Sequence, residues 1–296
     1  MKLSPHLLSR RDAIKATALG LASLPFISTG AGAASATAAA PAAAPAPKEG
    51  GLRLGVATYS TRLMSFDDTI SALKAMRIEN AGVFRAHRNW ETVSVDEARA
   101  AGEKLRAAGI ALTGSGVVNF TSDEPKARQA FDNARAAGMA TMVCKPALDA
   151  LPLVEKLAKE YDQKLAIHNH GPEDKVFPSP QSVWDAIKNL DARIGFCIDV
   201  GHAMRAKADP ATAIRQFASR LYDVHLKDSL AVPGSERDIP TEVGTGRMDI
   251  RGILHALREV KYSGVVALEY EKGVGNQVIG LAESVGYIRG MLATIP

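Results

Sequence analysis

Histidines and acidic residues gather at four points in the second half of the chain, each at the end of a short apolar run. The first is a His-Asn-His triplet that begins at His168, and the others contain Asp199, His225 and Glu269. Imidazoles and carboxylates that converge on one point repel one another, or are costly to remove from water, unless a cation neutralises them. These residues therefore predict a site for a divalent metal ion, held by His168, Asp199, His225 and Glu269. Mixed nitrogen and oxygen ligands suit manganese, iron, cobalt or zinc better than calcium.

These four segments need secondary-structure elements that carry them to one place. From Leu52 onward, short apolar runs alternate with longer amphipathic segments, which is typical of repeated βα units and a parallel sheet. The expected strands are Leu52–Ala57, Asn80–Phe84, Ile110–Val117, Ala140–Lys145, Lys164–His170, Ile194–Asp199, Leu221–Lys227 and Val265–Tyr270. The expected helices are Asp67–Met76, Ser94–Ala107, Glu124–Ala137, Ala150–Tyr161, Ser182–Leu190, Pro210–Ala218, Ile250–Glu259 and Leu281–Leu292.

The number of strand and helix pairs favours one fold class. Eight pairs match a TIM barrel, so we expect an α/β fold of the (β/α)8 type, in a single domain at residues 51–296. No glycine-rich phosphate-binding sequence follows the first strand, which reads GVATYSTR, so a nucleotide-binding sheet loses its main support. In a TIM barrel the reactive groups lie at the carboxyl ends of the strands. Side chains alternate between strand faces, so four pairs can point into the barrel mouth together: His168 and His170, Cys197 and Asp199, His225 and Lys227, Glu269 and Glu271.

The first 50 residues differ in character from the rest. Residues 1–36 have the layout of a signal peptide, with a basic segment containing Arg10 and Arg11, a mildly apolar stretch to about Ile27, and then small residues. The arginine pair resembles the twin-arginine export signal, although Ala13 stands where a large apolar residue is usual. The apolar stretch is too short and too rich in alanine and glycine for a membrane span. We therefore expect export by the twin-arginine machinery to the periplasm or beyond, no stable membrane insertion, and an Ala/Pro-rich linker at residues 37–50.

Composition and charge exclude several other classes. The chain has 296 residues, of which 46% are hydrophobic and 23% charged, as in an ordinary globular protein rather than a disordered or collagen-like one. The formal charge is +4, but the first 49 residues hold five basic residues against two acids, so the remainder is almost neutral. A nucleic-acid-binding protein needs a basic face, so we expect no nucleic-acid partner. Cys144 and Cys197 each lie in an apolar run, which predicts two buried free thiols and excludes a disulfide scaffold.

Longer motifs surround the predicted metal ligands. They read HNHGPED, CIDVGH, VHLKD, VGTGRMDI and YSGVVALEYE. Together they resemble the xylose-isomerase-like TIM-barrel family of sugar phosphate isomerases and epimerases, over roughly Leu52 to the C-terminus. In that family a Glu, an Asp, a His and a Glu from strands five to eight hold the metal, and Asp199, His225 and Glu269 match the last three. His202 and Lys227 match positions that usually face the substrate or support the ligands.

The chain departs from this family at the fifth strand, where the common Glu-Asn-His triplet begins with His168. Epimerases of the family use the glutamates of strands five and eight as acid and base on opposite faces of the sugar, so the resemblance implies a single such base here, Glu269. With a divalent ion the ligand set becomes neutral. Either His168 or His170 can be the ligand on this strand. His170, Glu173 or Lys145 can replace the lost acid or base, unless the reaction needs one base only.

Further polar residues lie where the barrel places its mouth. Lys145 ends the fourth strand, and Arg247 lies in the Gly-Thr-Gly-Arg loop after the seventh, where barrels often bind anions or hydroxyl-rich substrates. We predict substrate contacts for His170, Glu173 and Arg247. Tyr59, His87 and Asn119 lie near the ends of the first three strands and can also line the pocket. The predicted catalytic residues are Glu269, His202, Lys227 and Lys145.

These observations favour a metal-dependent sugar isomerase or epimerase. The metal would bind a carbonyl and a neighbouring hydroxyl, and Glu269 would remove the adjacent proton to give an enediolate. Sugar phosphates are mostly cytoplasmic, so export favours a non-phosphorylated sugar or keto-sugar as the substrate. If the intermediate instead expels a leaving group at the β carbon, the same site is a lyase, for example on a 3-keto-glycoside. A non-catalytic exported sugar-binding protein is a further alternative, whereas an apurinic-site endonuclease would need more metal ligands and a face for DNA.

Overall fold

A computed structural model describes residues 51–232, 238–272 and 277–295 of the chain. The predicted signal peptide, residues 1–36, and the predicted linker, residues 37–50, lie outside the described residues. No helix among the described residues has both the length and the apolar character needed to cross a membrane.

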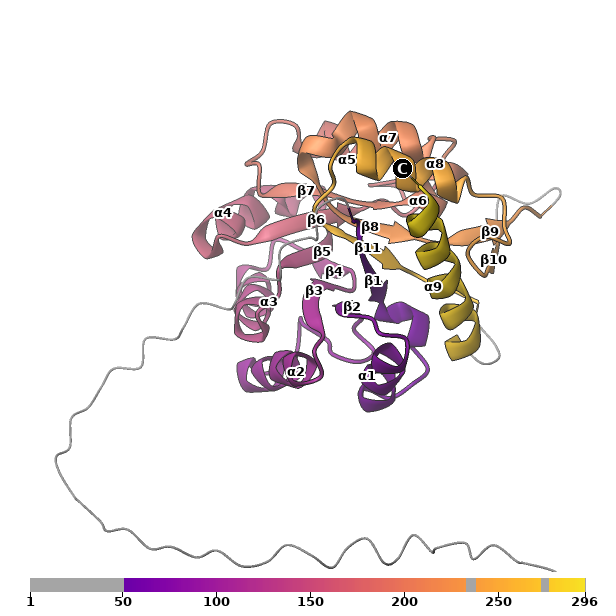
Figure 1. Cartoon of the computed structure of the whole chain (residues 1–296). Coiled ribbons are helices and arrows are strands. Elements are labelled where there is room, and N and C mark those ends of the chain that lie inside the picture. Colours follow the sequence, from indigo (N-terminus) through magenta and orange to yellow (C-terminus); the bar gives the residue numbers. More distant parts are fainter. Residues whose placement is uncertain (1–50, 233–237, 273–276, 296) are drawn as a thin grey trace, which may run out of the picture. The chain divides into compact units, whose positions relative to one another are not determined.

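The described chain forms a nearly closed barrel of parallel strands surrounded by helices (Figure 1). Around the barrel the strand order is β3-β2-β1-β11-β8-β7-β6-β5-β4, so strands that follow one another in the chain are neighbours almost throughout. The predicted (β/α)8 fold is confirmed. The strands of this sheet are β1 (Arg53–Ala57), β2 (Asn80–Val83), β3 (Ala111–Ser115), β4 (Val118–Phe120), β5 (Thr141–Pro146), β6 (Lys164–His168), β7 (Ile194–Asp199), β8 (Leu221–Leu226) and β11 (Val265–Leu268).

Helices connect successive strands and cover the outside of the barrel (Figure 1). Apolar stripes on these helices pack against the sheet, and most of the buried apolar residues lie in this outer layer. Two of the helices, at Glu124–Ala137 and Ile250–Glu259, have the predicted bounds. The helices are α1 (Phe66–Ala75), α2 (Val95–Ala107), α3 (Glu124–Ala137), α4 (Leu151–Tyr161), α5 (Pro180–Ile187), α6 (Val200–Arg205), α7 (Pro210–Phe217), α8 (Ile250–Glu259) and α9 (Gln277–Thr294), with 3₁₀ turns at Thr58–Thr61, Leu148–Ala150 and Ala218–Arg220.

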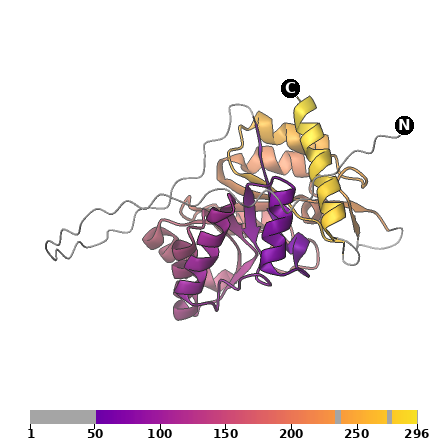
Figure 2. The ribbon, with the colours of Figure 1, turned by 60° about the horizontal axis from the view of Figure 1, so that its bottom comes forward.

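The last helix closes the ring against the first. Figure 2 shows α9, in yellow, running beside the indigo and purple segments that begin the barrel. Arg289 of α9 donates hydrogen bonds to the carbonyl oxygens of Met76 and Arg77, each at 2.7 Å, directly after α1. These contacts join the two ends of the barrel domain.

The third strand is interrupted, contrary to the single predicted strand Ile110–Val117. β3 ends at Ser115 and pairs with β2, whereas β4 begins at Val118 and pairs with β5. The Ser115 hydroxyl bridges the break, because Oγ lies 2.9 Å from Val143 N and 3.0 Å from Val143 O of β5. The Ser115 side chain thus takes the place of backbone hydrogen bonds to β5 at the point where the chain changes from pairing with β2 to pairing with β5.

Two elements near the barrel mouth are not in the prediction. Helix α6 begins directly after β7, and an antiparallel hairpin of β9 (Asp228–Leu230) and β10 (Ile239–Thr241) follows β8. Strands of three residues are too short to show a reliable alternation of polar and apolar residues, so sequence periodicity does not find them. Both elements nonetheless border the site described below.

Candidate metal centre and active site

Parallel strand register brings the four predicted ligands to one point. His168 and Asp199 are the last residues of β6 and β7, His225 lies near the end of β8, and Glu269 follows β11. Asp199 and His225 are direct partners across β7 and β8. Because the side chains of all four positions face the barrel interior, their donor atoms meet at its carboxyl end.

The donor atoms have the spacing of a metal site. One nitrogen or oxygen from each of the four residues lies within 4.8 Å of all the others. His168 Nε2 is 3.1 Å from His225 Nδ1 and 3.3 Å from Asp199 Oδ2, and His225 Nδ1 is 3.5 Å from Glu269 Oε2. Tetrahedral ligands at bond lengths of about 2.1 Å would lie roughly 3.4 Å apart. The three measured separations fit this spacing.

The two oxygens of Asp199 have different roles. Oδ1 accepts a hydrogen bond of 2.8 Å from His202 N and caps the start of α6. Oδ2 is buried and lies 2.8 Å from the Lys227 ammonium and 3.3 Å from His168 Nε2. The Lys227 ammonium is the cation that faces this buried oxygen in the folded chain. Two imidazoles and two carboxylates whose donor atoms meet at one point form a set that fits a divalent metal ion.

The protonation states of His168 and Glu269 suit a metal, whereas His225 must lose a proton when a metal binds. Burial acts to lower the pKa of the His225 imidazole, but Cys197 and Glu269 outweigh it and raise that pKa well above the usual value. Burial lowers the pKa of His168 to about 3, so its imidazole is neutral at physiological pH, which is the form that binds metals. Burial acts to raise the pKa of Glu269, but the charges of Lys227 and His225 outweigh it and hold that pKa below its usual range. Glu269 is thus ionised and can act as a ligand or accept a proton.

Lys227 supplies a fixed positive charge beside this cluster. Its Nζ lies 2.8 Å from Asp199 Oδ2, 2.6 Å from Glu269 Oε2 and 2.6 Å from Glu271 Oε1. Burial alone would lower the pKa of Lys227, but these carboxylates raise it well above its usual value, so the ammonium stays charged. Its stem passes over Gly201, where an added Cβ would lie only 2.8 Å from Lys227 Cδ. The glycine of the DVGH motif therefore gives Lys227 access to the cluster.

Three of the four donors open onto a cavity of about 350 Å³, here called the mouth cavity. The ring of Tyr59 meets Phe84 edge to face at 4.9 Å between centroids, which gives part of its wall a rigid apolar surface. The mouth cavity is lined by Ala57, Thr58, Tyr59, Gly82, Phe84, Arg85, Gly116, Val117, Asn119, Lys145, His168, His170, His202, His225, Glu269 and Glu271.

The predicted residues Lys145 and His170 both line the mouth cavity outside the donor cluster. Lys145 forms an ion pair with the loop residue Asp174, whose side chain is buried and whose Oδ1 accepts hydrogen bonds from the backbone N–H groups of Val176 and Phe177. His170 Nδ1 lies 3.1 Å from the carbonyl oxygen of His168, and burial lowers the pKa of its imidazole. On this strand, the structure places His168 rather than His170 among the four donors.

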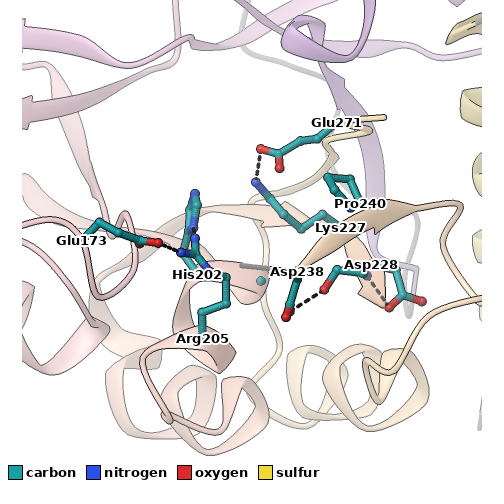
Figure 3. Close-up of a pocket in the computed structure, with 10 residues that line it drawn as sticks. Glu173, His202, Arg205, Lys227, Asp228, Asp238, Pro240 and Glu271 are labelled. Carbon is teal, nitrogen blue, oxygen red and sulfur yellow. Dashed lines mark hydrogen bonds and ion pairs between the residues drawn. The ribbon is translucent and has the colours of Figure 1, made fainter. Parts of the chain in front are cut away.

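A second cavity of about 300 Å³, here called the side pocket (Figure 3), shares two lining residues with the first. It contains three predicted residues, Glu173, His202 and Lys227, and Glu173 forms an ion pair with Arg205 of α6. His202 and Glu271 line both cavities and form their common wall. The side pocket is lined by Glu173, Gly201, His202, Arg205, Lys227, Asp228, Ser229, Asp238, Pro240 and Glu271.

The remaining predicted residues lie in different surroundings. Tyr59 and Asn119 line the mouth cavity, whereas His87 is buried behind it, with Nδ1 3.0 Å from Thr58 Oγ1 and Nε2 3.1 Å from Thr69 Oγ1. Arg247 lines neither cavity and instead pairs with Asp238 of the side pocket, at 2.6 Å.

Sequence reasoning named no role for Glu271, Asp174 or Asp228. Asp228 organises the loop after β8, since its carboxylate accepts hydrogen bonds from four backbone N–H groups, those of Ser229, Gly244, Gly246 and Met248. The available signal was the acid directly after Lys227 in VHLKD, followed by the glycine-rich VGTG segment.

Comparison with solved structures agrees with this architecture. A structure of the IolI protein with a bound zinc atom superposes with a TM-score of 0.69 at 14% identity, covering 83% of this chain and 99% of that one. The 3-keto-D-glucoside 4-epimerase of E. coli superposes with a TM-score of 0.61 at 14% identity, over 81% of this chain and 99% of the other. At such identities the likeness shows a shared fold.

Sequence comparison assigns the family. An uncharacterized protein of Methanocaldococcus jannaschii is 25% identical over 121 residues, which are 39% of this chain and only 40% of that relative's length. The family model described as "Xylose isomerase-like TIM barrel" matches residues 73–291, which include most of the barrel and all four candidate donors. The chain therefore belongs to the xylose isomerase-like TIM barrel family.

Proposed function

We propose that this chain is a metal-dependent sugar isomerase or epimerase that removes a proton from the carbon next to a carbonyl, on a non-phosphorylated sugar or keto-sugar. The main support is the donor cluster of His168, Asp199, His225 and Glu269, which opens onto a cavity of about 350 Å³. A pocket of this size suits a small ligand. Zinc, manganese, iron or cobalt fits the mixed nitrogen and oxygen donors.

The residues around the cluster supply the groups that this reaction needs. A divalent ion held by the four donors would polarise a sugar carbonyl and stabilise the negative charge that develops beside it. Glu269 is ionised, faces the mouth cavity and accepts the proton from the adjacent carbon. Lys227 balances the charges of Glu269 and Glu271 on the other side of the cluster.

Return of the proton decides the product. Lys145 and His170 line the same cavity as Glu269 and are the candidates to deliver a proton to the other carbon or the opposite face of the sugar. Delivery to the neighbouring carbon gives isomerisation, and delivery to the opposite face gives epimerisation. The edge-to-face rings of Tyr59 and Phe84 would exclude water from one side of the substrate.

One observation favours a lyase as the second candidate. Glu269 is the only carboxylate among the donors that line the mouth cavity, because β6 ends in His168 and Asp199 lies buried behind the lining. An elimination needs one base: Glu269 takes the proton, the electron pair of the C–H bond forms a C=C bond, and the C–O bond at the β carbon breaks. The leaving oxygen then takes a proton. His202 lines both cavities and is the candidate to donate it. A 3-keto-glycoside has the required carbonyl, proton and leaving group.

Deuterium exchange tests both candidates. The full chain is loaded with Mn²⁺, and elemental analysis determines its metal content. The loaded protein is then incubated in D₂O with free sugars, keto-sugars and 3-keto-glycosides. Deuterium next to a carbonyl, seen by proton NMR, supports the proposal. A new stereoisomer or aldose–ketose pair identifies an isomerase or epimerase, and a released alcohol with an unsaturated sugar identifies a lyase. Sugar binding without exchange on any compound would contradict both and favour a non-catalytic binding protein.

We also propose export by the twin-arginine machinery, on the basis of the arginine pair in residues 1–36. Expression of the full chain in a bacterium with an intact machinery is expected to place it in the periplasm. Replacement of Arg10 and Arg11 by lysine would retain it in the cytoplasm, and periplasmic protein in a strain that lacks the machinery would contradict the route.

A further inference from the structure

The mouth cavity and the side pocket together form a site with two compartments. Each has a volume near 300 Å³, at the lower end for ligand sites, and the metal donors that face a cavity all face the mouth cavity. His202 and Glu271 line both compartments, so the two cavities lie next to each other on either side of these side chains. A substrate of one sugar unit would leave the side pocket without a contact.

The side pocket is built from charged side chains that already have partners. Figure 3 shows Glu173, His202 and Arg205 on one side, Asp228, Asp238 and Pro240 on the other, and Lys227 with Glu271 between them. Glu173 pairs with Arg205, and Glu271 pairs with Lys227. Asp238 accepts from the Ser229 hydroxyl at 2.8 Å and pairs with Arg247.

The balance of these charges selects the kind of ligand. Two cations, Arg205 and Lys227, line the side pocket. The four carboxylates that line it are those of Glu173, Asp228, Asp238 and Glu271. A phosphate or carboxylate group placed there would lie among more negative than positive charges and would be repelled. Sugar hydroxyls both donate and accept hydrogen bonds, so they can bind carboxylates and cations alike.

The β9–β10 hairpin gives this pocket a defined outer wall. Ser229 and Pro240 are partners across the hairpin and both line the pocket. The next pair, Leu230 and Ile239, is 45% and 55% exposed, as expected for the opposite face of the same strands. One face of the hairpin thus borders the pocket while the other faces solvent.

From this geometry we infer that the side pocket binds a second, uncharged sugar unit, so that the substrate is a glycosidically linked disaccharide or larger glycoside. Its reacting ring lies in the mouth cavity and its second ring in the side pocket. The inference rests on the proposed function for the placement of the reacting ring, and it adds the substrate class.

Binding measurements on the full, Mn²⁺-loaded chain test this inference. The probes are methyl 3-keto-α-glucoside and methyl 3-keto-β-glucoside, the corresponding 3-keto-glucosyl-glucose compounds, and the latter with a 6-phosphate on the second ring. Isothermal titration is expected to show at least one disaccharide binding about tenfold more tightly than its methyl glycoside, and the phosphate form binding more weakly than the neutral one.

Two tryptophan variants of the hairpin locate the effect. Pro240→Trp fills the side pocket and is expected to abolish the preference for the disaccharide. Ile239→Trp, one residue away on the solvent face, is the matched control and is expected to keep the wild-type preference. Thermal unfolding verifies that both variants fold. If Pro240→Trp does not fold, the comparison of neutral and phosphorylated disaccharides on the wild-type chain still decides.

The outcomes separate this inference from the proposed function. Equal binding of disaccharides and methyl glycosides, no binding of either, or tighter binding of the phosphate form would overturn the side pocket as a neutral sugar site. Deuterium exchange is measured on the same samples. Exchange without a disaccharide preference supports the proposed function and contradicts the inference. A disaccharide preference without exchange supports the side pocket as a sugar site and contradicts the proposed reaction.

Discussion

The two halves of the barrel contribute differently to its mouth. Strands β1 to β5 lead to the rings of Tyr59 and Phe84, to small residues and to a few polar side chains that reach the cavity from its wall. Strands β6, β7, β8 and β11 lead to the metal donors. The donors therefore come from consecutive neighbours in the sheet, and the other half shapes the space in front of them. Substitutions of the donors themselves should abolish metal binding or chemistry, and substitutions of cavity-lining residues in the wall half should only weaken the reaction.

The largest effect is expected from loss of a donor. Asp199→Asn keeps the Oδ1 cap of α6 but replaces the Oδ2 ligand by a neutral amide group. We expect metal content below about a tenth of the wild-type value, and loss of proton exchange, because a weakened ligand usually lowers metal affinity strongly. Elemental analysis after dialysis measures this. Asp223→Asn, which removes a buried carboxyl of β8 outside the donor set, is the control and should retain metal.

The second effect separates metal binding from chemistry. Glu269→Gln removes the proposed base and is expected to lower the exchange rate by about 10² to 10⁴-fold. Metal should be retained in part, because Glu269 faces the mouth cavity, where water can take its place at the ion, whereas Asp199 is fully buried and water cannot replace it. Glu242→Gln is the control. The Glu242 carboxylate binds Tyr270 and Lys272 and lines neither cavity, so its loss should leave the exchange rate unchanged. Full exchange activity in Glu269→Gln would assign the base elsewhere.

A moderate effect is expected on the wall side. Lys145→Met removes the ammonium that β5 presents to the mouth cavity, paired with Asp174. We expect kcat to fall by about one order of magnitude with metal content unchanged, because the donors lie on other strands. Lys126→Met, a substitution of an exposed lysine on α3, is the control. Loss of metal in Lys145→Met would break the proposed division between the two halves.

The smallest effect concerns stability in the wall half. Burial lowers the pKa of His87 below 6.5, so the folded protein holds this imidazole neutral while the unfolded chain protonates it near that value. Its contribution to stability is present above pH 6.5 and is lost as the pH falls below it. The unfolding temperature of the metal-free protein should thus drop between pH 7.5 and 5, and His87→Gln should reduce that drop by a few degrees.

Sequence periodicity predicted most of the barrel because each unit carries its own signal. Helix α3 begins after the N-cap Asp123 and ends at Gly138, whose positive φ stops the helix, so local chemistry marks both bounds. The donor cluster was predictable for a related reason. Parallel strands place their carboxyl ends at one edge, so polar residues at those ends must meet.

Other features depend on contacts that no local pattern records. The break between Ser115 and Val118 follows from how the barrel closes onto β5, and the side pocket depends on a hairpin of three-residue strands. The direction of a loop side chain is equally non-local. Arg247 and Glu173 are both loop charges near the mouth, yet one pairs with Asp238 beside the side pocket and the other lines that pocket opposite Arg205.

The two separate roles of the Asp199 oxygens affect how the proposed site would bind an ion. The cap bond from His202 N and the bonds to Asn169, at 3.0 and 3.1 Å, hold this residue in place through groups that are not metal donors. Its rotamer is fixed by folding, so capturing an ion freezes little additional side-chain motion and requires little conformational entropy. We therefore expect the folded chain to release and recapture its ion reversibly, without unfolding between the two states.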